Sequence, residues 1–235
     1  MLKNFIKKLM YPNRYSSPAL IESLRKNGAV IGDDVHFYAP ATSLVDINSA
    51  RFIEIGSHVM FTSNVTLLAH DYSCFVLANA FDSMPRKQQK TVIGNNVFVG
   101  MNVTILMGTH IGDNVIIGAG SVVSGNIESD SVYAGNPAKK VCTLKEHYDK
   151  NCEHFIESAA CYAEEFRRVK GRLPKIDEMI IYRALFCSQK ELSDYANKEN
   201  FRCITKKAKD NMSMPEFENK FSTVQELLEY VKDKH

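Results

Sequence analysis

Aliphatic residues recur at every sixth position through the middle of the chain. The strictest run reads Ile93, Val99, Ile105, Ile111, Ile117 and Val123, and four of these six residues are followed directly by glycine. A second register, four residues further along each time, is small or β-branched: Val97, Val103, Thr109, Val115 and Ser121. A period of six matches neither the 3.6 residues per turn of an α-helix nor simple strand alternation over this length. It matches coils of three short strands, so we predict a mainly β protein with a left-handed parallel β-helix over residues 29–142.

The corners between such short strands need residues that tolerate a positive φ angle. Gly, Asn and Asp cluster at the expected places, at 32–34, 94–96 and 112–114. The amino-terminal half keeps the second register but has Ser43 and Ser49 where the first register calls for aliphatic residues. We therefore expect distorted first coils. A β-sandwich with accidental spacing is the alternative fold for this pattern.

The repeat breaks once, between Leu67 and Ile93, where 26 residues stand in place of a multiple of six. This segment must leave the β-helix and return to it, and we expect a protruding loop at about residues 71–91. Long excursions from a rigid scaffold often carry function. The loop is therefore the first place to look for a site.

Helical spacing replaces the period of six on both sides of the repeat. Residues 143–235 are expected to form a helical extension whose first helix ends near Gly171, whose second runs from Asp177 to Asn197, and whose last begins at Ser222 with a capping box to Gln225. Residues 1–28 are expected to form an amino-terminal helical segment. Its apolar face would pack on the body of the protein or lie on a membrane surface, and comprises Leu2, Phe5, Ile6 and Leu9.

Composition narrows the class of protein. Twenty-nine basic and 27 acidic residues give a net charge of +2, which does not favour nucleic acid as a partner. The six cysteines lie far apart without a CxxC pair, as expected for reduced thiols in a cytoplasmic protein. No run of about 18 apolar residues predicts a transmembrane segment, and the amino end lacks an apolar stretch typical of a signal peptide.

The segment from Thr91 to Val141 resembles the last coils of the hexapeptide-repeat acyltransferases. The resemblance rests on the IGDN-type corners, on Gly-Ala-Gly-Ser at 118–121 and on Asn-Pro-Ala-Lys at 136–139, and it covers about residues 25–142. It is closest to the maltose, galactoside and polysaccharide O-acetyltransferases. It implies transfer of an acetyl group from acetyl-CoA to a sugar hydroxyl, by a homotrimer with its sites between adjacent prisms.

The resemblance implies that His70, at the start of the loop, is the general base. An imidazole has a pKa near neutral pH, which suits removal of a proton from a hydroxyl that attacks a thioester. The neighbouring Asp71 would orient the imidazole, bind the acceptor sugar, or do neither. Adjacent strand residues point to opposite sides, which keeps these alternatives open. A main-chain N–H is the expected oxyanion donor, without an assignment to a residue.

For the co-substrate, the resemblance implies contacts of the pantetheine arm with Met101, Gly118 and Ala119. Ser124 stands where the family often has Thr followed by Lys, and Gly125 replaces that lysine, so one phosphate contact is in doubt. Lys139 or Lys140 would meet the 3′-phosphate of CoA, or both are simply solvated.

Two further departures and one loop feature bear on the acceptor. Phe98 replaces the usual tryptophan, and Pro40 stands where galactoside acetyltransferases have a substrate-binding Asn, so acceptor specificity does not carry over. Arg86, Lys87 and Lys90 of the loop would attract an anionic acceptor or CoA, or form an ordinary solvated stretch.

The same β-helix also serves other functions. A γ-class carbonic anhydrase needs three histidines around zinc, two of them close in sequence, but 12 residues separate His58 from His70 and 40 separate His70 from His110. We therefore expect no metal. Amino-sugar N-acetylation, serine O-acetylation and a non-catalytic scaffold remain alternatives to saccharide O-acetylation.

Overall fold

The computed structural model describes residues 8–199, 203–212 and 214–233. The chain separates into two compact units with the boundary between Glu146 and His147, and each unit is described by itself.

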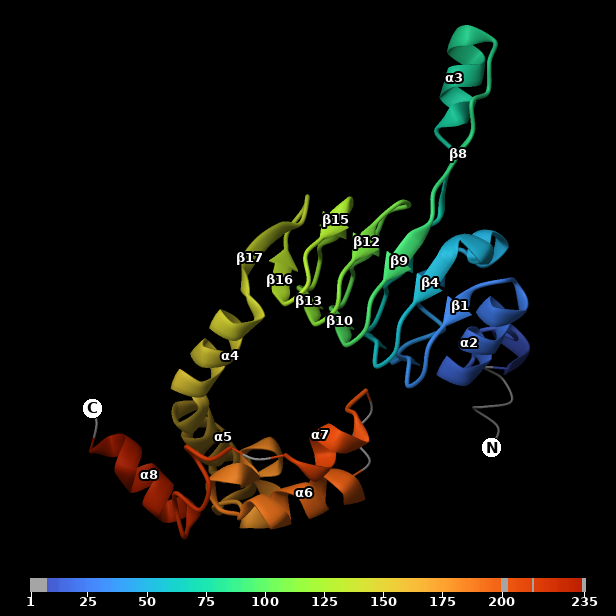
Figure 1. Ribbon diagram of the computed structural model, residues 1–235. Coiled ribbons are helices and arrows are strands. Elements are labelled where there is room, and N and C mark those ends of the chain that lie inside the picture. Colours follow the sequence, from blue (N-terminus) through green and yellow to red (C-terminus); the bar gives the residue numbers. More distant parts are fainter. Residues whose placement is uncertain (1–7, 200–202, 213, 234–235) are drawn as a thin grey trace. The chain divides into compact units, whose positions relative to one another are not determined.

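The amino-terminal unit is built from three sheets whose strands run parallel, except for the last strand of the second sheet (Figure 1). The first sheet contains β1 (Val30–Ile31), β4 (Ile53–Ile55), β9 (Thr91–Ile93), β12 (His110–Ile111) and β15 (Asn126–Ile127). The second contains β2 (His36–Phe37), β5 (Met60–Phe61), β10 (Val97–Val99), β13 (Val115–Ile117), β16 (Ser131–Ala134) and β17 (Lys139–Thr143). The third contains β3 (Leu44–Val45), β6 (Thr66–Leu67), β11 (Thr104–Ile105) and β14 (Val122–Val123). The predicted left-handed parallel β-helix is confirmed.

The core is a stack of the aliphatic residues of the repeat. Strand pairing places Ile93 beside Ile55 on one side and Ile111 on the other, and Ile105 between Leu67 and Val123. All of these side chains are buried. The polar residues of the second register are tolerated because their hydroxyls are satisfied, as with Ser121, whose Oγ donates to the carbonyl of Gly118 at 2.6 Å.

The corners stack as closely as the strands. Asn96 and Asn114 adopt positive φ angles of 54° and 58°, and the Asn96 amide donates to Asn114 Oδ1 at 2.8 Å. A Cβ atom added at Gly94 would lie 2.7 Å from the carbonyl carbon of Gly112 in the next coil. No side chain fits that gap, which explains the glycine after the aliphatic position.

Coil length varies along the β-helix. Corner residues that bond from one coil to the next are 24 positions apart for Asp33 and Ser57, 38 for Ser57 and Asn95, 18 for Asn95 and Asp113, and 16 for Asn114 and Asp130. The first coil therefore exceeds the regular 18. Part of its extra length forms η1, a kinked 3₁₀ segment at Ile47–Phe52, and the expected distortion is found there.

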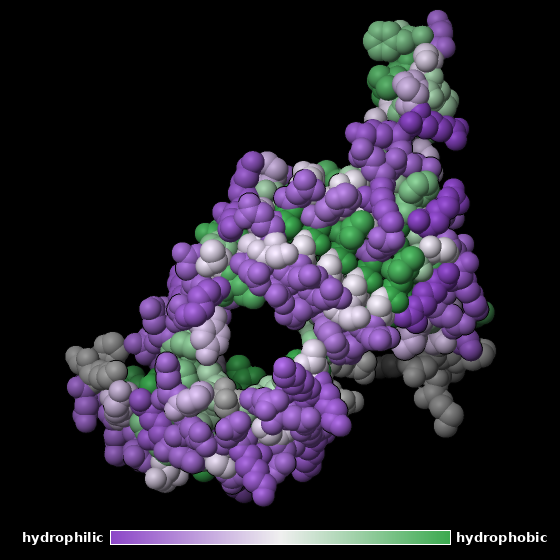
Figure 2. Space-filling model, in the orientation of Figure 1, coloured by the Kyte–Doolittle hydropathy of each residue, from purple (hydrophilic) through white to green (hydrophobic). Residues whose placement is uncertain are grey.

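The second coil carries the long excursion, which we call the arm, residues 70–88. It consists of β7 (His70–Asp71) and β8 (Lys87–Gln88), paired antiparallel, with α3 (Cys74–Phe81) at the tip. The arm projects from the β-helix (Figure 1), and its tip carries hydrophobic surface (Figure 2). The exposed apolar side chains are those of Tyr72, Phe75, Val76, Leu77, Phe81 and Met84.

Both ends of the β-helix are covered by other elements. At the start, α2 (Ser17–Lys26) buries Leu20 and Leu24, and Ser17 Oγ accepts the Phe37 N–H at 2.9 Å. At the end, β17 turns back and pairs antiparallel with β16. Of the expected amino-terminal apolar face, Leu9 is exposed, and Leu2, Phe5 and Ile6 lie outside the described residues.

The carboxy-terminal unit has its own apolar core. Its elements, with α4 crossing the unit boundary, are α4 (Leu144–Glu153), α5 (Phe155–Lys170), η2 (Ile176–Glu178), η3 (Ile180–Leu185), α6 (Gln189–Lys198), α7 (Lys206–Asp210) and α8 (Val224–Lys232). The first helical stretch ends at Gly171 as expected, with φ 70° there, although it is not one helix, because His154 divides it into α4 and α5. No helix among the described residues of the chain is long and apolar enough to cross a membrane.

Two expectations for this unit are wrong. The helix predicted from Asp177 to Asn197 begins only at Gln189, because Ile180 has a φ of 48° and the chain before Ser188 is 3₁₀ helix. The last helix is capped by Thr223 rather than Ser222: Thr223 Oγ1 accepts the Glu226 N–H at 3.1 Å.

Candidate functional site

His70 lies at the corner between the third and first sheets, where β7 starts the arm. Its side chain is 20% exposed, so the ring is held by the protein while one edge remains accessible. The Tyr72 ring stands beside it, with 4.2 Å between the centroids.

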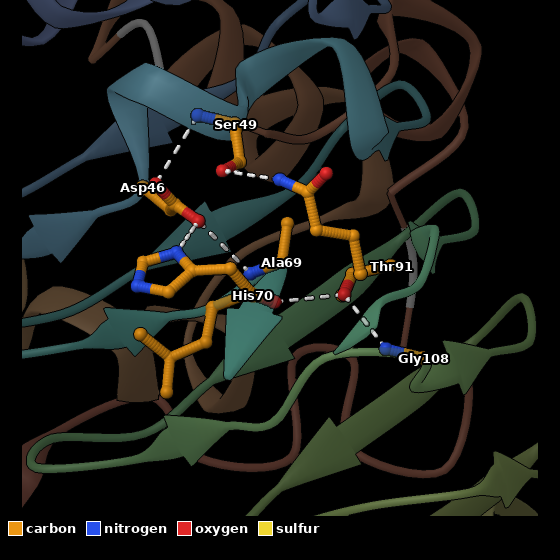
Figure 3. A network of polar contacts seen from close by, with 8 residues as sticks. Asp46, Ser49, Ala69, His70, Thr91 and Gly108 are labelled. Carbon is orange, nitrogen blue, oxygen red and sulfur yellow. Dashed lines mark hydrogen bonds and ion pairs between the residues drawn. The ribbon is translucent and has the colours of Figure 1, made fainter. Parts of the chain in front are cut away.

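The partner of His70 is Asp46, which follows β3 on the preceding coil. Asp46 caps η1, because its Oδ1 accepts the Ser49 N–H at 3.2 Å. Its Oδ2 contacts Nδ1 of His70 and accepts the Ala69 N–H at 3.4 Å (Figure 3). The Asp46 side chain is only 4% exposed, so this carboxylate is buried with each oxygen engaged.

This contact determines which ring nitrogen of a neutral His70 carries the proton. A carboxylate accepts hydrogen bonds, so Nδ1 is the N–H and Nε2 keeps its lone pair. Figure 3 shows Nε2 on the side of the ring away from Asp46. The arrangement therefore presents a proton acceptor whose orientation is fixed by a buried carboxylate.

Asp71 does not orient the imidazole, which corrects one of the expectations for that residue. Its two carboxylate oxygens accept from the main-chain N–H and the hydroxyl of Ser73, at 2.7 and 2.9 Å. These hydrogen bonds hold the pKa of the Asp71 carboxyl below its usual value. Asp71 thus shapes the turn into the arm, and the carboxylate that contacts the His70 ring is that of Asp46.

Sequence reasoning missed Asp46, although a signal was present. Gly32 and Gly56 mark equivalent corners 24 residues apart, and Asp46 and His70 are separated by the same 24 positions. If the first coil is taken to be 24 residues long, Asp46 falls one coil before His70 and therefore beside it.

The residues expected to bind CoA occupy two corners that both border the third sheet. Met101 and Ala119 lie on successive coils at the corner that joins the second sheet to the third, where the carbonyl of Met101 accepts the Gly120 N–H at 2.8 Å. Gly118 begins this corner, and both Met101 and Ala119 are exposed. Ser124, also exposed, lies at the corner that joins the third sheet to the first, the same corner as His70.

The two lysines expected near the 3′-phosphate differ in their surroundings. Lys140 donates to Glu128 Oε2 at 2.6 Å, and this hydrogen bond raises the pKa of the ammonium group. Lys139 is exposed, and no carboxylate of the described residues pairs with it. Of the loop cations, Lys90 forms an ion pair with Glu54.

Neither His58 nor His110 is brought to the site as a metal ligand. His58 lies at a corner between the first and second sheets, 3.3 Å from Asp34, and His110 is exposed on β12. Within 8–199, 203–212 and 214–233, no group of three or more His, Cys, Asp or Glu side chains is placed to hold a metal ion.

Comparisons with known proteins agree with the fold. The family model described as "Bacterial transferase hexapeptide (six repeats)" matches residues 90–125. Protein CapG of Staphylococcus aureus is 33% identical over 133 residues, which cover 57% of this chain and 76% of that protein. The putative lipopolysaccharide biosynthesis O-acetyl transferase WbbJ of Escherichia coli is 36% identical over 102 residues, 40% of this chain and 52% of WbbJ.

A third relative matches a shorter stretch of this chain at a higher sequence identity. A probable macrolide acetyltransferase of Lysinibacillus sphaericus is 57% identical over 67 residues, which cover 28% of this chain and 36% of that protein. The chain thus spans only about half of WbbJ and a smaller part of the macrolide enzyme. The repeat, the β-helix and the match across three quarters of CapG together assign the chain to the bacterial transferase hexapeptide family.

Proposed function

We propose that the protein is an acetyl-CoA-dependent O-acetyltransferase that acetylates a saccharide hydroxyl, with His70 as general base. The observation that carries the proposal is the buried Asp46 carboxylate on Nδ1 of His70, at the corner where the arm leaves the β-helix. It supports a base because it leaves Nε2 as an oriented acceptor.

The proposed chemistry is a direct transfer in a ternary complex. Nε2 of His70 removes the hydroxyl proton as the acceptor oxygen attacks the thioester carbonyl. Asp46 stabilises the imidazolium that forms. The carbon–sulfur bond then breaks, and His70 returns its proton to the departing sulfur, which yields the acetyl ester and CoA. The proton transfers need only His70 and Asp46, and a main-chain N–H is the expected donor to the oxyanion.

A covalent acyl-enzyme is not part of the proposal. Cys74 is the cysteine nearest to His70 in the sequence, but it is buried at the base of α3, and its Sγ lies 3.8 Å from the Tyr72 carbonyl. A thiol in that environment is not presented to a substrate. We therefore expect no burst of CoA release that precedes product.

The third sheet is the proposed path of the CoA arm. It runs between the corner of Met101, Gly118 and Ala119 and the corner that holds His70 and Ser124. A pantetheine extended along this face would contact exposed main chain at the corner of Met101, Gly118 and Ala119, and would bring the thioester to His70 at the other corner. Lys139, rather than the paired Lys140, is the proposed contact of the 3′-phosphate.

For the acceptor, two relatives suggest two classes of molecule. WbbJ is named as an O-acetyl transferase of lipopolysaccharide biosynthesis, which favours a saccharide. The 57% identity to a probable macrolide acetyltransferase favours a second candidate, a macrolide hydroxyl, with the same base and the same chemistry. Amino sugars and serine are the remaining acceptors to test.

We further propose that copies of this chain associate, as a homotrimer. Met60, Phe98 and Ile116 align across the second sheet and point outward, and Phe98 is 40% exposed. A flat apolar row of this kind is typical of a surface that another protein covers. The molar mass by light scattering checks this in the same preparation as the activity assay.

The test is CoA release from acetyl-CoA with a panel of saccharides, a macrolide, amino sugars and serine. His70→Ala is expected to lose about 10²-fold or more in kcat, the usual contribution of a general base, with acetyl-CoA binding intact by calorimetry. His58→Asn is the matched control, because His58 also faces an aspartate, and Asn tolerates its φ of 59°.

Three results would contradict the proposal. Equal activity of His70→Ala and the unchanged protein would remove His70 as the base. A selective preference for amines or serine would replace the acceptor class. Absence of CoA binding and of turnover with every acceptor would favour a scaffold.

A further inference from the structure

A second polar contact ties the arm to the first coil, apart from the His70 pair. Gln88 Nε2 donates to Ser49 Oγ at 3.2 Å. Gln88 belongs to β8, the returning strand of the arm, and it is the residue directly opposite His70 in the β7–β8 ribbon. Opposite residues of an antiparallel pair project from the same face, so both side chains reach toward the first coil.

Ser49, which accepts this hydrogen bond, is the residue at which η1 is kinked. It is buried, and its φ of −109° and ψ of 21° break the 3₁₀ geometry there. Its N–H is held by Asp46 Oδ1 and its hydroxyl by Gln88. One residue is therefore fixed from two sides, by the carboxylate of the proposed site and by the arm.

These contacts close a ring. Asp46 contacts His70, the β7–β8 pairing joins His70 to Gln88, Gln88 binds Ser49, and the Ser49 N–H returns to Asp46. Figure 3 shows the Asp46, Ser49 and His70 part of the ring on the corner of the β-helix. A displacement of β8 would pull on Ser49 and so on the carboxylate beneath the imidazole.

Two further hydrogen bonds at the base of the arm do not involve Asp46, unlike the one from the Ala69 N–H to Asp46 Oδ2. Thr91 Oγ1 donates to the carbonyl of Leu68 at 2.8 Å and accepts the Gly108 N–H at 3.2 Å, which binds the base of the arm to the next coil (Figure 3). These bonds fix where the chain leaves and returns. On the returning strand of the arm, Gln88 is the residue whose side chain bonds to η1.

We infer that Gln88 is a positioning residue, which holds η1 and the arm in the one geometry that keeps Asp46 on Nδ1 of His70. The kinetic part of this inference rests on the proposed function. The structural part, that Gln88 acts on the His70 ring through Ser49 and Asp46, stands without it.

The experiment compares Gln88→Ala, Ser49→Ala and the double variant with Gln89→Ala, which removes the neighbouring amide from the same segment. One lost positioning hydrogen bond is expected to lower kcat about fivefold to tenfold, with KM nearly unchanged. The double variant is expected to be no slower than either single variant, because both remove the same link. Gln89→Ala is expected to match the unchanged protein.

A second readout does not need turnover. With ¹⁵N-labelled histidine, NMR reports the tautomer of the His70 ring, assigned by the signal missing in His70→Ala. The unchanged protein is expected to give the Nδ1–H form, and Gln88→Ala a mixture of tautomers.

The outcomes separate the two claims. Additive losses in the double variant, or an unchanged tautomer in Gln88→Ala, would overturn the positioning role. If the unchanged protein has no activity, the proposed function fails, and the tautomer measurement still decides whether Gln88 positions the ring.

Discussion

The two halves of the β-helix differ in how strictly they follow the repeat. From Thr91 to Ile127 the coils advance by 18 or 16 residues, and little but strand and corner is present. From Val30 to Lys90 they advance by 24 and then 38 residues. The additional residues form η1 and the arm, and these two insertions supply Asp46 and His70. The regular coils offer a uniform surface, whereas the irregular coils carry the candidate base.

A physical reason underlies this division. In a regular coil each side chain is either stacked on its counterparts above and below or exposed on a flat face, so few polar groups converge. An insertion leaves the stack and has to satisfy its own backbone groups with side chains. Asp46 does this for η1 and for Ala69, and the same carboxylate is thereby left beside an imidazole.

The largest expected effect would come from a cavity in the regular half. Ile105→Ala removes a fully buried side chain between Leu67 and Val123, and such truncations cost about 2–5 kcal/mol of unfolding free energy. Urea unfolding measures the loss, with the outward-facing Thr104→Ala on the same strand as control. Equal stability of the two variants would refute the claim that the stacked register holds the β-helix together.

In the irregular half, Asp46→Asn is expected to change stability less and to lower kcat. In Asp46→Asn, the Oδ1 cap of η1 can persist, but an amide that donates to Nδ1 favours the tautomer with a proton on Nε2. We expect kcat to fall on the order of 10²-fold, while the melting temperature falls less than in Ile105→Ala, because the amide group loses only the 3.4 Å hydrogen bond from the Ala69 N–H. Asp34→Asn, the carboxylate beside His58, is the control. Full activity of Asp46→Asn would remove Asp46 from the mechanism.

The smallest effect concerns the carboxy-terminal unit, which has neither repeat nor candidate site. Arg172 and the Lys175 main chain donate to Glu178 and lower the pKa of that carboxyl from 4.5 to about 2. The folded state therefore gains stability above about pH 4.5 and loses it as the pH falls toward 2.

Arg172→Gln tests this contribution. Because Arg172 is solvent-exposed and Glu178 partly so, the gap between the unfolding curves should be small at neutral pH and vanish near the acid end. Circular dichroism at a series of pH values measures it. A gap that widens in acid would contradict the sign of this linkage.

The regular coils were predictable because their aliphatic and small residues recur at a fixed spacing along the sequence. The distortion of the first coil was predictable too, from Ser43 and Ser49, although its form as a 3₁₀ segment was not. His70 was singled out by the family resemblance together with the break of the register beside it. Asp46 was not, because its role depends on which residues lie one coil apart when the coil has an unusual length.

The helical unit was harder to predict, because helical spacing does not reveal an interruption. Apolar spacing predicted a single helix across Ile180, whose backbone lies in the left-handed region that β-branched residues rarely adopt. The choice between Ser222 and Thr223 as a cap depends on one residue of register. Either hydroxyl could accept a hydrogen bond from an N–H of the first helical turn. In the structure Thr223 Oγ1 accepts the Glu226 N–H.

The reversed strand β17 sets a limit on how copies of this molecule can combine. A parallel coil offers its open edge to any further strand of the same direction, including one from another chain, and unchecked addition would produce a fibre. On the second sheet, that edge is taken by a strand that runs the opposite way and carries Lys139 and Lys140. On this sheet β17 therefore blocks the addition of a parallel strand from another copy. Copies can then associate through the flat sides of the β-helix.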